Sequence, residues 1–230
     1  MMEEALHPRE DLYTGIHKAL RALLCDTLVR AGAMDVEDGE ETAVVLAAVR
    51  NLIDLTRHHL HHENQHVHPL LEARVAGATA SLMREHIEHE EAFERLEAAV
   101  RAVEQAAGAA RAAAALALYR ELALYAAEDF RHMHEEETRT NALLWERCTD
   151  AELKAAHHAI VSGIAPDLMA RYVRWLVPSM TPAERAALLA GAQASVPPQV
   201  FAGMLQMVRP LIGEAGWAKL GRALALPRAA

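Results

Sequence analysis

Several kinds of residue are scarce in this chain, and each scarcity narrows the classes of protein to consider. Only 2 of the 230 residues are cysteine, and Cys25 and Cys148 lie far apart without a CxxC motif, which is typical of reduced thiols in a cytoplasmic protein. Aromatic residues make up 4%, so the core must consist mostly of Leu, Ala, Val, Ile and Met. Basic residues are also few, 23 against 32 acidic, and a net charge of −9 argues against a general nucleic-acid binder.

Long apolar runs are missing as well. The longest uncharged stretch, residues 186–208, contains Pro197, Pro198, glutamines and a serine, whose backbone and side chains would lack hydrogen-bond partners in lipid. We therefore expect no membrane span. The first ten residues, MMEEALHPRE, have neither the basic nor the apolar region of a secretory signal, and this favours a cytoplasmic location.

The pattern that is present is helical. Four stretches with helical periodicity, about residues 9–31, 40–75, 80–105 and 111–147, are separated by glycine-containing segments at 32–39, 77–80 and 106–111. Alanine is abundant, and it loses no side-chain entropy in a helix. The sequence predicts an all-α fold in which residues 1–148 form an antiparallel four-helix bundle.

The chain changes character after residue 148. Seven of the nine prolines lie beyond residue 150, and they predict short helices near 151–162, 166–177, 182–192, 197–208 and 210–225. Residues 150–230 hold eight basic and five acidic side chains, a net charge of +3, which leaves −12 on residues 1–149. We interpret residues 149–230 as a separate helical C-terminal extension.

Histidine is the most unusual component, with 14 residues, 11 of them between positions 17 and 134. At about 100° per residue, His59 and Glu63 lie one above the other on one helix face, whereas His61 and His68 point the opposite way and are expected to be exposed. The fourth helix repeats the HxxxE spacing with His132 and Glu136, and Glu128, one turn earlier, is a candidate hydrogen-bond partner for His132.

The spacing of these residues predicts that they lie at one depth. In an antiparallel hairpin, two residues at the same depth are equidistant from the turn. The midpoint of His17 and His59 is residue 38, the midpoint of His86 and Glu136 is residue 111, and both fall in predicted turns. The midpoint of Glu63 and His86 is 74.5, a few residues short of the predicted turn at 77–80. All six residues can therefore share one layer of the bundle.

Such a layer is suited to a metal site. Buried carboxylates and imidazoles without partners would cost several kcal/mol each, and a bound cation compensates. Imidazole and carboxylate together suit iron, zinc, manganese or copper. Six ligands are too many for one tetrahedral zinc ion and fit two octahedral ions bridged by carboxylates. In the third helix, His86 and the neighbouring His89 are alternative ligands. Tyr13, one turn before His17, is expected to pack, with hydrogen bonding to a ligand of the metal as the alternative.

The motifs resemble those of the hemerythrin-like (HHE cation-binding) family of non-haem di-iron proteins over residues 9–147. In chain order, the residues that carry the resemblance are His17, His59, Glu63, His86, His132 and Glu136. The resemblance implies that the four histidines are terminal ligands of two iron ions and that the two glutamates bridge the ions. The segments RYVRWLVPSMTPAERAALLAG and GWAKL also resemble an extension found in bacterial hemerythrin-like proteins.

The resemblance implies a protein that binds or senses O2, NO or peroxide, or that responds to iron. Oxygen-carrying members have HxxxH in the third helix, where this chain has His86 and Glu90, so the likeness is closer to iron-centre repair proteins and iron-sensing domains with paired HxxxE helices. The alternative is a di-iron redox enzyme that consumes peroxide or delivers iron. A ferritin-like oxidase and a structural protein that captures metal adventitiously are further alternatives. For the C-terminal extension, a second copy of the chain and another protein are the alternative partners.

Overall fold

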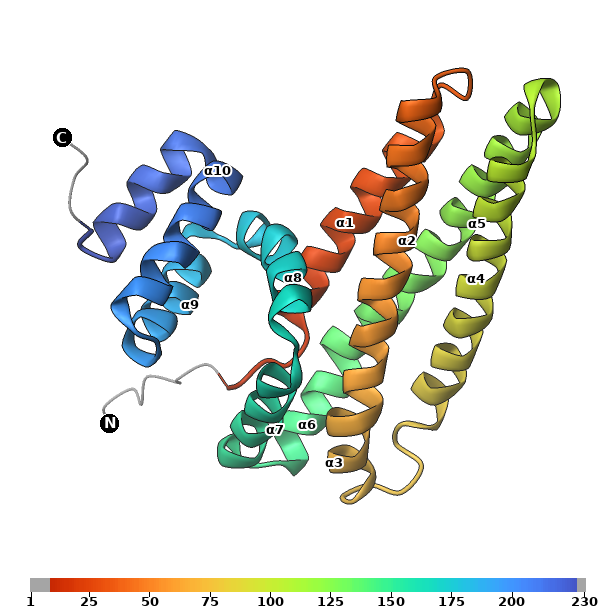
Figure 1. Cartoon of the computed structure of the whole chain (residues 1–230). Helices are drawn as coiled ribbons and strands as arrows, with labels where there is room; N and C mark the ends of the chain where they lie inside the picture. The colour runs from red at the N-terminus through yellow and green to blue at the C-terminus, as the bar shows by residue number, and fades with distance from the viewer. Residues whose placement is uncertain (1–8, 227–230) are drawn as a thin grey trace, which may run out of the picture.

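The computed structural model describes residues 9–226, and within this range the chain contains helices and no strand. Four long helices run side by side: α1 (Thr14–Ala33), α2 (Gly39–His62), α4 (Ala80–Gln105) and α5 (Gly108–Glu135) (Figure 1). Each overlaps one of the predicted helical stretches, and no end extends more than three residues beyond the predicted bounds. The predicted all-α fold with an antiparallel four-helix bundle is confirmed.

Local sequence accounts for the reversals between these helices. Asp38 precedes α2, and its carboxylate accepts hydrogen bonds from the backbone N–H groups of Glu40 and Glu41, which have no partner within the helix. Before α5 the chain turns at Gly108, whose φ of 51° lies in the left-handed region that glycine adopts without strain. These turns set the depth at which residues of neighbouring helices meet.

Two of the helices contain an unexpected π-helical turn. Helix α2 continues through η1 (Glu63–Val67) into α3 (His68–Glu72), and α5 continues through η2 (Glu136–Thr140) into α6 (Asn141–Arg147). In the first case Pro69 has no N–H to donate to the carbonyl four residues earlier, so the α-helical hydrogen-bond pattern is interrupted there. In the second, the Thr138 hydroxyl donates to the His134 carbonyl at 2.6 Å, a side-chain bond of the kind that bends helices.

The π-turn corrects one expectation about the histidines. His61 is exposed as predicted, but His68 is buried, with 3% of its surface exposed. In an uninterrupted α-helix His68 would stand about 140° around the axis from Glu63. The wider turn at residues 63–67 rotates His68 to the inner face instead. The expectation of an exposed His68 was wrong because helical periodicity alone does not reveal a change in hydrogen-bond pattern.

Apolar cores lie on both sides of the histidine-rich layer. The upper core is formed by α1, α2, α4 and α5 and includes the fully buried Leu24, Phe93 and Leu118. The lower core closes the base of the bundle, where Tyr13 meets residues of α3, α6 and α7. Its other buried members are Val67, Leu71, Leu144, Cys148 and Leu153. Cys25 and Cys148 form no disulfide.

The C-terminal segment folds into α7 (Asp150–Gly163), α8 (Pro166–Ser179), α9 (Pro182–Ser195) and α10 (Pro198–Ala223). Thr149 and Thr181 cap α7 and α9 through reciprocal bonds with Glu152 and Glu184. The break predicted just before Pro210 falls instead at Gly213, where φ is 63° and ψ is 173°. Glycine permits this backbone conformation, so the chain bends there and Pro210 stays within the helix.

Helix α8 joins the extension to the bundle. The Tyr172 hydroxyl donates to the Leu55 carbonyl of α2 at 2.6 Å, and the Arg171 guanidinium donates to Asn51 and Asp54. Helices α9 and α10 lie on the far side of α8 and have their own core around Phe201 (Figure 1). The division at residues 148 and 149 stays a prediction, because the side chains of α8 extend the upper core of the bundle.

None of the helices between residues 9 and 226 combines the length and the apolar character that crossing a membrane requires.

Packing in the upper core gives a first prediction. Leu24 of α1 is fully buried, and Leu24→Ala should lower the free energy of unfolding by about 2–5 kcal/mol, the usual cost of such a cavity. Val29 lies on the same helix with 69% of its surface exposed, so Val29→Ala should change the free energy by less than about 0.5 kcal/mol. Urea unfolding measures both, and equal effects would contradict this assignment of the core.

Candidate metal centre

All six predicted site residues meet in one layer of the bundle. Their exposed fractions lie between 0% and 8%. Helix α1 contributes His17, α2 with η1 contributes His59 and Glu63, α4 contributes His86, and α5 with η2 contributes the last two, His132 and Glu136. Both glutamates stand at the first position of a π-turn, one helical turn after a histidine of the same helix.

One half of the layer is formed around His17 and His59. Their Nε2 atoms are 3.2 Å apart, and the His59 Nε2 lies 3.1 Å from Oε1 of Glu63. The His17 Nε2 lies 3.5 Å from Oε2 of Glu136. Two ligand atoms at about 2.1 Å from one metal ion and at right angles are about 3 Å apart, so these spacings fit one ion.

The other half repeats this arrangement around His86 and His132. Their Nε2 atoms are 3.1 Å apart, the His132 Nε2 lies 3.3 Å from Oε2 of Glu136, and the His86 Nε2 lies 3.6 Å from Oε2 of Glu63. In each half, two imidazoles and two carboxylates offer four ligand atoms that all lie within 4.8 Å of one another. Both glutamates belong to both halves, as carboxylates that bridge two ions would.

The carboxylates provide the test of whether a cation fits. All four oxygen atoms of Glu63 and Glu136 are buried and accept no hydrogen bond. Burial raises the pKa of Glu136 well above its usual value, and the negative charge of Glu63 raises it further. Two such carboxylates cannot both ionise side by side unless a positive charge lies between them. Bound metal ions supply that charge, so the donor set fits a pair of cations.

The Nδ1 atoms of three of the histidines, here called the outer nitrogens, each contact a polar side chain of a neighbouring helix. The His17 Nδ1 lies 3.1 Å from Glu137, the His86 Nδ1 lies 2.9 Å from Asn64, and the His132 Nδ1 lies 2.7 Å from Glu85. Such contacts orient the imidazole and leave Nε2 free to bind a metal. The expected partner of His132, Glu128 of the same helix, is not the one found.

Sequence reasoning missed Asn64, Glu85 and Glu137. A signal for two of them was present, because Asn64 and Glu137 directly follow the glutamates of the HxxxE motifs. Each side chain reaches across to the histidine of the neighbouring helix, His86 and His17 respectively. Glu85 reaches His132 from another helix, and no spacing within one helix would reveal that contact.

The electrostatic environment favours neutral imidazoles in the second half of the layer. Burial lowers the pKa of His86 to about 4 and that of His132 to about 2. Both rings are therefore uncharged at neutral pH, which is the form that binds metals. Burial opposes ionisation of Glu137, but hydrogen bonds with His17 and Arg21 lower its pKa to about 2, so the carboxylate that orients His17 is ionised.

His89, the alternative to His86, is buried but belongs to neither four-residue group. Its ring lies edge-on to that of His132, with the centroids 4.8 Å apart, and its Nδ1 has no hydrogen-bond partner. The structure thus brings His86, rather than His89, together with the other predicted site residues.

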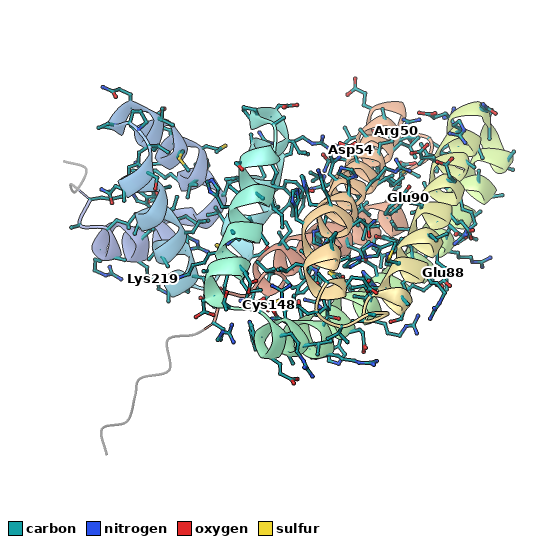
Figure 2. All side chains as sticks on the ribbon, turned by 90° about the horizontal axis from the view of Figure 1, so that it is seen from below. Arg50, Asp54, Glu88, Glu90, Cys148 and Lys219 are labelled. Carbon is teal, nitrogen blue, oxygen red and sulfur yellow. The ribbon has the colours of Figure 1, made fainter. Side chains whose placement is uncertain are left out.

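A cavity of about 460 Å³ leads to the layer between α2 and α4. It reaches inward to His86, and Glu90 lies on its α4 side (Figure 2). Its other lining residues are Arg57, His58, Leu60, His61 and Asn64. His86 is the residue of the layer that lines this cavity.

The comparison with protein-family models decides the family. The model of the hemerythrin HHE cation-binding domain matches residues 10–144. The chain belongs to the hemerythrin HHE cation-binding family. A comparison with curated proteins gave no match, and neither did one with solved structures. The matched segment contains the whole histidine and glutamate layer, so this hemerythrin-family protein binds metal ions, and α7 to α10 lie beyond the match.

The contacts of the outer nitrogens give a second prediction. Glu85→Ala removes the partner of the His132 Nδ1 and should weaken metal binding by about 10–100-fold, as loss of such partners does in other metal sites. Glu88→Ala is the matched control, because Glu88 lies on the same helix and is exposed (Figure 2). Competition with a chromophoric chelator measures both affinities, and equal affinities would show that Glu85 does not orient His132.

The paired carboxylates give a third prediction. Because the pKa of Glu136 is raised in the fold, its carboxyl destabilises the metal-free protein at pH values above its unfolded pKa of about 4.3. Glu136→Gln should therefore raise the melting temperature of the metal-free protein at pH 7. With metal ions at 100 times their dissociation constant, the unaltered protein should gain about 2.7 kcal/mol and become the more stable one.

Calorimetry with and without a chelator distinguishes the outcomes of this third prediction. The cost of the carboxyl grows as pH rises through its unfolded pKa, so the advantage of Glu136→Gln without metal should shrink between pH 7 and pH 4. A variant that is less stable than the unaltered protein by the same amount in both metal states would contradict the prediction.

Proposed function

We propose that this protein holds two iron ions and binds or senses a small ligand such as O2, NO or peroxide, or responds to iron supply. His17 and His59 would be terminal ligands of one ion, His86 and His132 of the other, and Glu63 and Glu136 would bridge the two. The observation that carries the proposal is that two groups of four ligand atoms share both carboxylates.

The number of ligand atoms supports a binding or sensing role. Octahedral coordination has six positions, and each half of the layer supplies four protein atoms. The remaining positions would be open to an external ligand, and a bound pair of iron ions would supply redox chemistry with O2, NO or peroxide. The cavity between α2 and α4 gives such a ligand a path from the solvent as far as His86.

The C-terminal extension provides a route by which binding could be passed on. The Tyr172 hydroxyl of α8 donates to the carbonyl of Leu55, one helical turn before His59. A shift of α2 on ligand binding would move this contact. We propose that residues 149–230 relay such a change to a partner, either a second copy of the chain or another protein. We propose a cytoplasmic location, which the two unpaired cysteines support.

A redox enzyme is the second candidate, and the cavity that reaches His86 supports it by admitting a small substrate. Peroxide consumption would distinguish enzyme from sensor. Turnover by the iron-loaded protein that disappears in a folded Glu63→Ala variant would establish the enzyme, whereas saturable binding without turnover would favour the sensor.

Anaerobic reconstitution gives a fourth prediction, which tests the proposal directly. We expect two iron ions per chain by elemental analysis, and an absorption spectrum that changes when O2 or NO is added. Glu63→Ala should retain fewer than two ions, because it removes a carboxylate common to both halves. One zinc ion per chain without iron would refute the proposal.

A further inference from the structure

His68 is a buried imidazole that the metal centre described above does not use. Only 3% of its surface is exposed, and neither Nδ1 nor Nε2 has a hydrogen-bond partner. Burial of a polar group without a hydrogen-bond partner costs free energy. Two such atoms on one imidazole therefore indicate that the ring binds something absent from the structure. Its ring stacks on that of His86, with the centroids 4.9 Å apart and the planes at 28°.

The π-turn at Glu63–Val67 gives His68 this position. His59, Glu63 and His68 follow one another along the inner face of α2, η1 and α3. His68 belongs to neither group of four ligand atoms, but its ring stacks on that of His86, which belongs to one of them. An imidazole at this place can donate a hydrogen bond to a molecule that occupies an open coordination position.

Two further unpartnered groups occur at the same end of the layer. The Tyr13 hydroxyl is fully buried without a hydrogen bond, and its ring lies 5.4 Å from that of His17. Asn141 follows Glu136 by five residues, as His68 follows Glu63, and its buried Oδ1 also has no partner. The phenolic O–H of a tyrosine is a hydrogen-bond donor.

These groups are separated from the base by apolar side chains. Tyr13 packs with Val67, Leu71 and Leu144 in the lower core, and α3 lies against α6. Tyr13, His68 and Asn141 are thus buried beside an apolar core, so a small ligand that reached them would be shielded from water. Hydrogen bonds to a charged ligand are stronger in such surroundings than in water.

We propose that His68, assisted by Tyr13, donates a hydrogen bond to the small anionic ligand that binds at the metal pair. This inference rests on the proposed function, because the ligand needs the metal ions for its main attachment. It assigns the ligand to the side of the metal layer that faces α3 and α6. The expected ligand is a compact anion whose terminal atom carries a lone pair that can accept the hydrogen bond. Azide is a suitable probe for such a ligand.

A fifth prediction tests this role with the full-length iron-loaded protein. His68→Leu should keep two iron ions per chain and raise the dissociation constant of azide at least about tenfold, the effect of losing one hydrogen bond to a charged group. His68→Gln keeps an N–H donor and should recover part of the affinity. His134→Leu is the matched control, because His134 is exposed and should leave both iron content and azide affinity unchanged.

The metal-free protein gives a second readout. His68→Leu removes two unpartnered nitrogens, so its melting temperature without metal should equal or exceed that of the unaltered protein. Unchanged azide affinity in an iron-loaded His68→Leu variant would overturn this inference alone. Loss of iron from both His68 variants would also overturn it, since His68 would then be a ligand. Failure of the unaltered protein to bind two iron ions would refute the proposed function itself, and this inference with it.

Discussion

The rest of this structure depends on one constraint: two carboxylates lie side by side in the buried interior of the bundle. Glu63 and Glu136 are buried, they share the same neighbours, and their four oxygens accept no hydrogen bond from the protein. Such a pair is unfavourable by itself and favourable around cations. The imidazoles that approach these oxygens from all four helices, and the outer contacts that orient them, are arranged to receive metal ions.

Much of this layer could be predicted from the sequence because it depends on simple periodicities. The HxxxE spacing places His59 with Glu63 and His132 with Glu136 on one face of a helix, and equal distances from a turn bring facing helices into line. The π-turns could not be predicted in this way. They arise from competition for backbone hydrogen bonds, at Pro69 and at Thr138, and they change the face on which His68 lies.

Side-chain contacts between segments far apart in the chain also could not be predicted from the sequence. Glu85 of α4 reaches His132 of the neighbouring α5, and Arg171 of α8 reaches Asn51 and Asp54 of α2. These contacts join polar groups whose separation in the chain follows no period. In a view along the bundle, α8 and the helices that follow it lie on the side away from α4, with Lys219 opposite Glu88 (Figure 2). The extension meets the bundle through α8, which packs on α1 and α2, and through α7, which packs on η1, the turn that begins at Glu63.

The position of the polar layer between two apolar cores explains how the fold accommodates it. Unpartnered buried groups reduce stability, and here they concentrate in the layer and just below it, at Glu63, Glu136, His68 and Tyr13. The cores above and below are apolar and fully buried, around Phe93 and around Leu144. Packing of the apolar cores at both ends of the bundle can thus stabilise the fold. The residues of the middle layer can then be suited to binding ions and ligands, although their unpartnered groups reduce stability.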